Sequence, residues 1–258
     1  MDSSCSGSDC GVRHRGGKGL TNYELLSDLF GVLLGTLDTE LGDIKVEGCT
    51  LRRPISICEI DREKGTIRIV FEIRGSGTDR LSMLNVGDDV DMIAPLGNGF
   101  STGIADGKRI IVIGGGIGVP PMLQTAKEYK KVTAILGFRS YGKIILTDDF
   151  AKNGIETIVC TDDGSVGTIG TIAEPLKNEL EKGDVGAVFA CGPKPMLGAI
   201  IQLAKEYGVY SEVSLEERMG CGVGACVGCV CKIMRGGEEK MLRVCKDGPV
   251  FKGEEVIL

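Results

Sequence analysis

Four cysteines near the end of the sequence have the residue type and spacing of a metal-cluster site. They follow the pattern Cys221-x4-Cys226-x2-Cys229-x15-Cys245, with glycines among the first three. Two irons bridged by two sulfides need two thiolates each, and this is the plant-type ferredoxin spacing for such a [2Fe–2S] cluster. Zinc normally uses two Cys-x2-Cys pairs, and this segment has one, so a zinc site or a group of plain buried thiols is the weaker alternative. The pattern therefore predicts a [2Fe–2S] cluster, with Cys231 outside the ligand set.

A glycine-rich segment in the middle of the chain has the composition of a ligand-binding loop. Its sequence is Gly114-Gly115-Gly116-Ile117-Gly118-Val119-Pro120-Pro121. Glycines let a ligand approach the backbone closely, and a helix starting at the prolines would present its N-terminus to an anion. The segment is not the dinucleotide fingerprint G-x-G-x-x-G, because the third glycine would fall at Val119 or Pro121. Alone, it fits a ligand loop and an ordinary tight turn equally well.

Two further segments strengthen the ligand interpretation. Residues 161–165, Thr-Asp-Asp-Gly-Ser, and residues 191–193, Cys-Gly-Pro, each follow an expected strand. Ligands in open α/β sheets bind beyond the carboxyl ends of the strands, where these loops would gather. A third segment, Arg52-Arg53-Pro54-Ile55-Ser56, could bind a pyrophosphate and reach the edge of a flavin ring. By itself that segment is better explained as a solvated basic pair.

The elements that would position these residues are of two kinds. Expected strands are the apolar runs at 108–113, 132–138, 156–160, 185–191 and 210–215. Expected helices alternate with them at 120–130, 171–181 and 195–207, which is typical of βαβ units and a parallel sheet. Earlier strands, expected at 55–60, 66–73 and 89–96, indicate part of an antiparallel barrel or sandwich. Before these strands, leucines three and four residues apart predict a helix over 25–37.

Composition and charge exclude several classes of function. A net charge of −6 leaves no basic excess for a nucleic-acid backbone, and the absence of Trp argues against stacking on single strands. The sequence has no apolar run long enough to span a bilayer, which needs about 18 residues. Basic residues before the apolar stretch at 25–37 imitate a signal peptide, but Glu24 and Asp28 interrupt the pattern. We therefore expect a cytoplasmic protein, with no nucleic-acid or membrane partner, whose clustered cysteines bind metal.

Taken together, these motifs resemble the electron-transfer subunits of dihydroorotate dehydrogenase B, within the ferredoxin–NADP reductase superfamily. The resemblance covers residues 51–258 in register. It rests on segments 51–57, 94–100, 114–121, 161–165, 191–193, 217–226 and 244–251.

The resemblance implies an α/β plus β fold in several parts. An N-terminal antiparallel β-barrel that binds FAD would be represented by residues 51–101, and a parallel-sheet domain that binds NAD by residues 102–210. A small [2Fe–2S] domain would occupy residues 211–258. Residues 1–50 do not show the family's barrel strands, and we interpret them as an aberrant segment or a genuine replacement.

The resemblance also implies roles for particular residues. The FAD contacts would be Arg53, Pro54, Ile55, Ser56, Val70, Phe71 and Glu72, with Gly77 and Thr78 beside its phosphates. The NAD contacts would be Gly115, Gly116, Gly118, Cys191, Gly192 and Pro193. The cluster ligands would be the four cysteines already named, and no acid–base catalytic residue is expected in this chain.

The implied activity is electron transfer in pyrimidine (UMP) biosynthesis. A partner subunit carrying FMN would oxidise dihydroorotate, and electrons would pass through the cluster and FAD to NAD⁺. The expected assembly is a heterotetramer with two copies of each subunit. Two alternatives stay open: the small subunit of a ferredoxin:NADP or sulfide dehydrogenase-type reductase, and a cysteine-rich binding module that uses zinc structurally.

Overall fold

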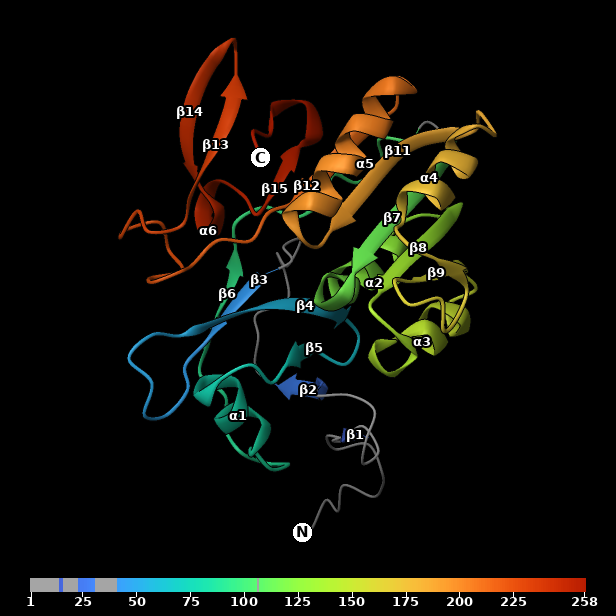
Figure 1. The fold of residues 1–258 in the computed structure, drawn as a ribbon. Helices are drawn as coiled ribbons and strands as arrows, with labels where there is room; N and C mark the ends of the chain where they lie inside the picture. The colour runs from blue at the N-terminus through green and yellow to red at the C-terminus, as the bar shows by residue number, and fades with distance from the viewer. Residues whose placement is uncertain (1–13, 16–22, 31–40, 106) are drawn as a thin grey trace.

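The computed structural model of the 258-residue chain describes residues 14–15, 23–30, 41–105 and 107–258. Two large sheets and one hairpin organise these residues. In Figure 1 the parallel sheet and its helices lie to the right, the antiparallel sheet lies below, and the hairpin lies at the upper left. The fold is therefore antiparallel β followed by α/β, with a small cysteine-rich C-terminal part, as the sequence predicts.

The second sheet has the strand order β10-β9-β8-β7-β11-β12-β15, and only its last pair is antiparallel. Its strands are β7 (Arg109–Gly115), β8 (Val132–Phe138), β9 (Glu156–Thr161), β10 (Thr168–Ile169), β11 (Val185–Cys191), β12 (Tyr210–Ser214) and β15 (Val250–Lys252). Its helices are α2 (Val119–Lys127), α3 (Thr147–Lys152), α4 (Ala173–Leu180) and α5 (Lys194–Glu206). The predicted alternation of strands and helices is confirmed.

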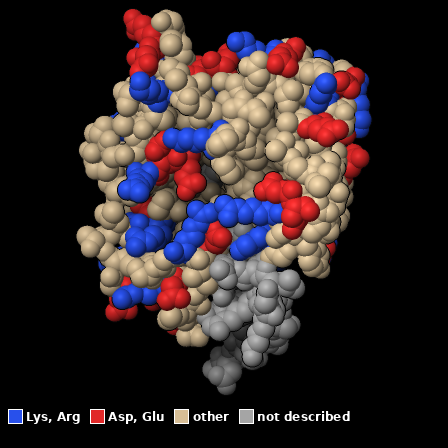
Figure 2. Space-filling view, in the orientation of Figure 1, with Lys and Arg blue, Asp and Glu red and all other residues tan. Residues whose placement is uncertain are grey.

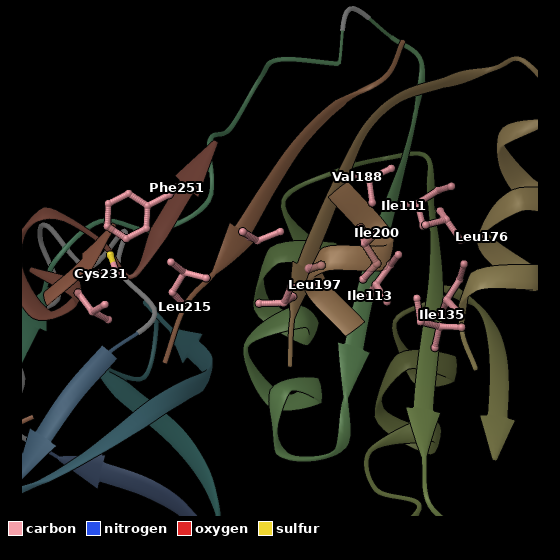
Figure 3. Close-up of a cluster of buried hydrophobic side chains, with 14 of the residues drawn as sticks. Ile111, Ile113, Ile135, Leu176, Val188, Leu197, Ile200, Leu215, Cys231 and Phe251 are labelled. Carbon is pink, nitrogen blue, oxygen red and sulfur yellow. The ribbon is translucent and has the colours of Figure 1, made fainter. Parts of the chain in front are cut away.

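Helices cover both faces of this sheet, because its central strands β7, β8 and β11 are apolar along nearly their whole length. Ile111 and Ile113 of β7 pack with α4 and α5, whereas Ile110 and Val112 pack with α2 and α3. Figure 3 shows the first of these layers, in which Leu197 and Ile200 of α5 approach β7. The parallel sheet is thus buried between two cores.

The first sheet is antiparallel, with the order β1-β2-β5-β4-β3-β6. Its strands are β1 (His14–Arg15), β2 (Tyr23–Phe30), β3 (Leu41–Ile44), β4 (Arg53–Asp61), β5 (Thr66–Glu72) and β6 (Met92–Leu96), with helix α1 (Ser76–Ser82) after β5. Its core contains Ile44, Ile57, Ile69 and Phe71. This sheet is therefore built from three strands before residue 50 and three after it.

The helix predicted over 25–37 is wrong where the structure describes the chain. Residues 23–30 form strand β2, which pairs antiparallel with β5 from Tyr23 opposite Glu72 to Phe30 opposite Thr66. Local helix periodicity is a weak preference, and pairing with a strand far along the chain overrides it here. Residues 31–37 of the predicted helix lie outside the described residues.

The C-terminal segment packs on the parallel sheet. It contains the hairpin β13 (Val230–Arg235) and β14 (Glu238–Arg243) and the short helix α6 (Val244–Asp247), after which β15 pairs with β12. Cys231 and Phe251 belong to the same core as Ile111 and Leu197, and Figure 3 shows Leu215 beside them. The cysteine-rich part therefore shares a core with the sheet.

Charged side chains join the two large sheets. Arg68 of β5 donates to Glu59 of β4 at 2.7 Å and to Asp149 of α3 at 2.6 Å, and Lys127 of α2 donates to Glu59 at 2.9 Å. Within the described ranges, no helix is both long and apolar enough to cross a membrane. The ion pairs fix one sheet against the other, and a cavity opens at their junction.

Candidate cofactor cavity and cysteine site

A cavity of about 880 Å³ lies between the two large sheets. This volume is near the upper end of the range for small-molecule sites, about 300–1,000 Å³. The antiparallel sheet contributes Leu41, residues 54–56, Val70, Glu72, Arg74 and Thr78 to its lining. The parallel sheet contributes residues 115–118, 137–139, Asp162 and 191–193, which all lie at the carboxyl ends of strands. The cavity thus gathers loops from most of the chain.

The cavity brings together nearly all of the predicted cofactor residues. Its lining includes every one of them except Arg53, Phe71 and Gly77. The Phe71 side chain is 2% exposed and packs in the core of the antiparallel sheet, on the opposite face of β5 from Val70 and Glu72. Arg53 and Gly77 lie against each other, because a Cβ on Gly77 would collide with the Arg53 guanidinium.

The loop of residues 114–118, here the glycine loop, packs tightly against the loop that follows β11. A Cβ on Gly118 would collide with the carbonyl oxygen of Cys191, and one on Gly115 would lie 2.5 Å from Sδ of Met196. Gly116 has a φ of 55° and no atom within 4 Å of its hypothetical Cβ. Glycine therefore brings two strand-end loops into contact and leaves one backbone position open.

Three cationic side chains in the lining were missed by sequence reasoning. Arg74, Arg139 and Lys143 line the cavity, and Glu72 forms ion pairs with Arg74 and Lys143. Figure 2 shows Lys and Arg side chains crossing the middle of this face, beside a hollow. Arg139 follows the end of β8 in the parallel sheet, so the rule that ligands bind at such strand ends could have found it. Arg74 follows β5 of the antiparallel sheet, to which this rule does not apply. The charge of all three side chains suits an anionic ligand.

The four predicted cysteine ligands lie at one edge of the molecule, in residues 220–229, here the cysteine loop, and in helix α6. Cys229 and Cys245 are each 2% exposed, whereas Cys221 is half-buried and Cys226 is exposed. Backbone hydrogen bonds link the four residues in two pairs, because the N–H of Cys226 donates to Sγ of Cys221 and the N–H of Cys245 donates to Sγ of Cys229. The site therefore has an outer pair and a buried pair.

Backbone N–H groups of the cysteine loop point at the sulfurs. Sγ of Cys221 accepts hydrogen bonds from the N–H groups of Ala225 at 3.2 Å and Cys226 at 3.3 Å. Gly228 donates to Sγ of Cys226 at 3.4 Å, and Cys245 donates to Sγ of Cys229 at 3.5 Å. Donors around a sulfur stabilise its thiolate form, which is the form that binds iron.

The pKa values of Cys221 and Cys245 are shifted in opposite directions. The N–H of Cys226 lowers the pKa of Cys221 to about 6, whereas burial raises the pKa of Cys245 to about 12. Within the described residues, no three His, Cys, Asp or Glu side chains surround a single point where a metal ion could sit. Two thiol pairs match the requirement of two bridged irons, each with two protein ligands.

Cys231 is close to the ligand set but has a different environment. It is buried, its Sγ donates to the carbonyl of Leu242 at 3.5 Å, and burial raises its pKa to about 11. The cavity that is lined by residues 54–56 is also lined by Glu217 and Met219, just before the cysteine loop. The cysteine site and the cavity are therefore adjacent in the fold.

Comparisons with known proteins agree on the type of protein that this chain resembles. Residues 216–257 match the family described as the iron–sulfur cluster binding domain of dihydroorotate dehydrogenase B. The electron transfer subunit of dihydroorotate dehydrogenase B (NAD(+)) from Bacillus caldolyticus is 46% identical over 213 residues, covering 81% of this chain and 80% of that protein.

Solved structures extend the likeness to nearly the whole chain. An NADH-dependent reduced ferredoxin–NADP oxidoreductase, studied for flavin-based electron bifurcation, has a TM-score of 0.80 and 26% identity, covering 97% of this chain and 91% of that one. Phthalate dioxygenase reductase shares the fold, with a TM-score of 0.58 and 16% identity, covering 92% of this chain and 76% of that one.

Proposed function

Because this chain belongs to the family of electron-transfer subunits of NAD-dependent dihydroorotate dehydrogenase B, we propose that its cavity binds FAD and NAD and that its cysteines bind a [2Fe–2S] cluster. The chain is an oxidoreductase subunit with a ferredoxin–NADP reductase-like fold, and it works with a catalytic subunit. One observation carries the cofactor proposal. A single cavity joins residues 54–56 to residues 191–193, and it is also lined by Glu217 and Met219, directly before the loop that carries three of the four predicted cluster cysteines.

The flavin side of the cavity is formed by β4 and β5. We assign Pro54, Ile55, Ser56, Val70 and Glu72 to the flavin, because they line the cavity from adjacent strands. Phe71 would contribute through its backbone alone, since its side chain is buried in the core. When bound, the flavin supplies the change from one-electron to two-electron chemistry that links an iron–sulfur cluster to a nicotinamide.

The phosphate side of the flavin would lie near α1. Arg53 and Gly77 are in contact there, and the side-chain hydroxyl of Thr78 accepts from the N–H of Arg74 at 2.9 Å and donates to the carbonyl of Gly75 at 3.1 Å. The Thr78 hydroxyl thus shapes the turn, and the positive charges of Arg53 and of Arg74, which is paired with Glu72, lie on the side of the cavity where they would attract phosphate. Residues 51–101, with β1–β3 before them, would form this domain.

The nicotinamide nucleotide would lie across the carboxyl ends of β7, β9 and β11. The glycine loop and residues 191–193 form its floor, and α2 begins directly after the glycine loop, so that its N-terminus favours an anion. Of the two acidic residues after β9, Asp163 accepts hydrogen bonds from Ser165, and only Asp162 lines the cavity. A carboxylate at this place favours a ribose hydroxyl over a phosphate, and therefore NAD over NADP.

The outer thiol pair would face the catalytic subunit. Cys226 is exposed, and two apolar neighbours, Val223 and Val227, are 50% and 57% exposed. Exposed apolar side chains around a redox centre are typical of a docking surface. We propose that the partner carries FMN, oxidises dihydroorotate, and joins this chain in a heterotetramer with two copies of each.

Co-expression of the full chain with the catalytic subunit tests the proposal. The purified complex is expected to contain FAD and about two irons per chain and to form NADH from dihydroorotate. Cys226→Ser should abolish dihydroorotate-dependent NADH formation but keep NADH oxidation by an artificial acceptor that takes electrons from the flavin. Cys231→Ser, the matched control, should keep both activities.

Other outcomes would contradict the proposal. Zinc in place of iron, or a colourless protein, would support the binding module. Activity with reduced ferredoxin and none with dihydroorotate would support the ferredoxin:NADP reductase. The chain is 46% identical to a dihydroorotate dehydrogenase subunit and 26% identical to the ferredoxin–NADP oxidoreductase. This difference favours the dihydroorotate dehydrogenase function.

A further inference from the structure

Asp43 is a buried acidic residue that the proposed electron-transfer chemistry leaves without a role. It lies in β3 and is 1% exposed. In the described part of the structure, its Oδ1 atom is buried and has no hydrogen-bond partner. Buried polar atoms are almost always paired, so an unpaired carboxylate oxygen asks for an explanation.

The side chain of Asp43 faces the cysteine loop. A Cβ on Gly222 would collide with Oδ2 of Asp43, so the carboxylate lies directly against the backbone of Gly222. Gly222 follows the ligand Cys221 in sequence. Both carboxylate oxygens of Asp43 therefore lie beside the backbone that carries Cys221 and Cys226.

The same strand also reaches the flavin side of the cavity. Leu41 lies two residues before Asp43, on the same face of β3, and it lines the cavity. Asp43 pairs across the sheet with Pro54, which also lines the cavity. Asp43 is thus placed between the cavity and the cysteine loop, the two sites that exchange electrons in the proposed function.

Nearby arginines compensate this charge only indirectly. Arg52 directs its side chain to the backbone carbonyl of Asp43 and to the carboxylate of Asp91. Burial raises the pKa of Asp43, and the positive charges of Arg52 and Arg53 partly oppose this effect. In its ionised form, which the two arginines favour, the Asp43 carboxylate acts over a longer distance in this weakly polar interior than it would at the surface.

We propose that Asp43 is a positioning residue that holds the cysteine loop against the antiparallel sheet and lowers the reduction potential of the cluster bound there. The inference rests on the proposed function. Its physical basis is that an added electron is disfavoured near a buried negative charge. A lower potential would make the reduced cluster a better donor to the flavin.

The test is the midpoint potential of the cluster in the full chain, co-expressed with its catalytic subunit and measured by redox titration at a fixed pH. Asp43→Asn keeps the shape and removes the charge, and Asp43→Ala removes the whole carboxyl. Both variants are expected to change the ratio of reduced to oxidised cluster about tenfold in favour of the reduced form. This corresponds to a midpoint potential that is about 59 mV more positive for a one-electron step.

Asp91→Asn is the matched control. Asp91 carries the same charge and binds the same Arg52, but its side chain is 54% exposed, so its removal should leave the potential unchanged. Loss of iron from both Asp43 variants, with FAD retained, would also support the positioning role. A full iron content with an unchanged potential in either Asp43 variant would overturn the proposal.

The two proposals fail in different ways. If the wild-type complex lacked iron or FAD, the proposed function itself would fail. If the wild-type complex held both cofactors, but the Asp43 variants had the iron content and midpoint potential of the wild type, then only the assignment of Asp43 would be wrong.

Discussion

The glycine loop and the cysteine loop are both rich in glycine, yet they use it for different physical reasons. In the glycine loop, Gly114, Gly115 and Gly118 have ordinary negative φ or extended backbones, and a Cβ on any of them would strike a neighbouring atom. In the cysteine loop, Gly222 and Gly224 have φ values of 68° and 80°. Three glycines of the first loop therefore lack only the room for a Cβ, and Gly116, with a φ of 55°, needs only the left-handed backbone. In the second loop, Gly222 and Gly224 combine the two constraints, because a Cβ on either would also collide with a neighbouring side chain.

A high glycine content can therefore arise from two different constraints, namely a lack of room for a Cβ and a left-handed backbone. A high glycine content indicated ligand-binding loops in both places, but it could not show which property of glycine each loop used. Val227 shows that the cysteine loop imposes a left-handed backbone even where the residue is not glycine, because its φ is 58°. A β-branched residue in this conformation is a genuine outlier. Substitutions that add or remove a Cβ should separate the two constraints.

The largest effect is expected at Gly222, where both constraints meet. Gly222→Ala would place a Cβ in a left-handed backbone, at a cost of about 1–2 kcal/mol, and would also collide with the buried carboxylate of Asp43. Most of the iron should be lost, whereas FAD should stay bound. Iron and flavin contents of the purified complex measure both.

Gly236 provides the control for this variant. It has a φ of 66° in the β13–β14 turn, and no atom lies within 4 Å of its hypothetical Cβ. Gly236→Ala should therefore have the backbone cost alone and keep its iron. Equal iron loss in both variants would show that handedness, and not the contact with Asp43, controls the cysteine loop.

An intermediate effect is expected at Gly118. Gly118 has a φ of −79°, so Gly118→Ala strains no backbone angle, but the Cβ would strike the carbonyl of Cys191. The two loops that form the nucleotide floor would separate, and we expect KM for NADH to rise about tenfold, a loss of about 1.4 kcal/mol. Iron and FAD should be unchanged.

Gly198, in the interior of α5, is the matched control. Its hypothetical Cβ would meet Leu258 at 3.5 Å, an ordinary contact. Gly198→Ala should leave KM unchanged. If Gly118→Ala also left KM for NADH at the wild-type value, the glycine loop would not be the nucleotide floor.

The smallest effect, with the opposite sign, is expected at Val227. Val227→Gly relieves a left-handed backbone worth about 1–2 kcal/mol but adds freedom to the unfolded chain worth about 0.4–1 kcal/mol. The net stabilisation should therefore lie between about 0 and about 1.6 kcal/mol. Slower release of iron to a chelator, measured on the full chain, would show it, and faster release would contradict it.

The sequence predicted the centre of the parallel sheet well because β7, β8 and β11 are nearly uninterrupted apolar runs, whereas the short strands β10 and β15 were not predicted. The strand expected at 132–138 has the observed bounds of β8, and the observed β11 equals the expected 185–191. The antiparallel sheet was harder. Strand β2 gains its structure from β5, more than 35 residues away, and leucine spacing alone favoured a helix.

The residues of the candidate site were likewise predicted where they are close in sequence and missed where only the fold brings them together. The cysteine spacing identified four residues that the fold places together, since three of them are close in sequence. Arg74, Arg139 and Asp43 were missed, because their importance depends on which loops meet in space. Asp43 lies before residue 51, where the resemblance gave no guide.

Strand β15 shows why the cysteine-rich part cannot be treated as a detachable tail. It forms the last strand of the parallel sheet by pairing with β12, from Glu212 opposite Lys252 to Ser214 opposite Val250. A protein shortened before Val250 would leave the backbone of β12 open at the sheet edge, where strands of other molecules can add. Loss of β15 by proteolysis near this point would therefore favour aggregation, and residues 250–252 protect this edge of the sheet from self-association.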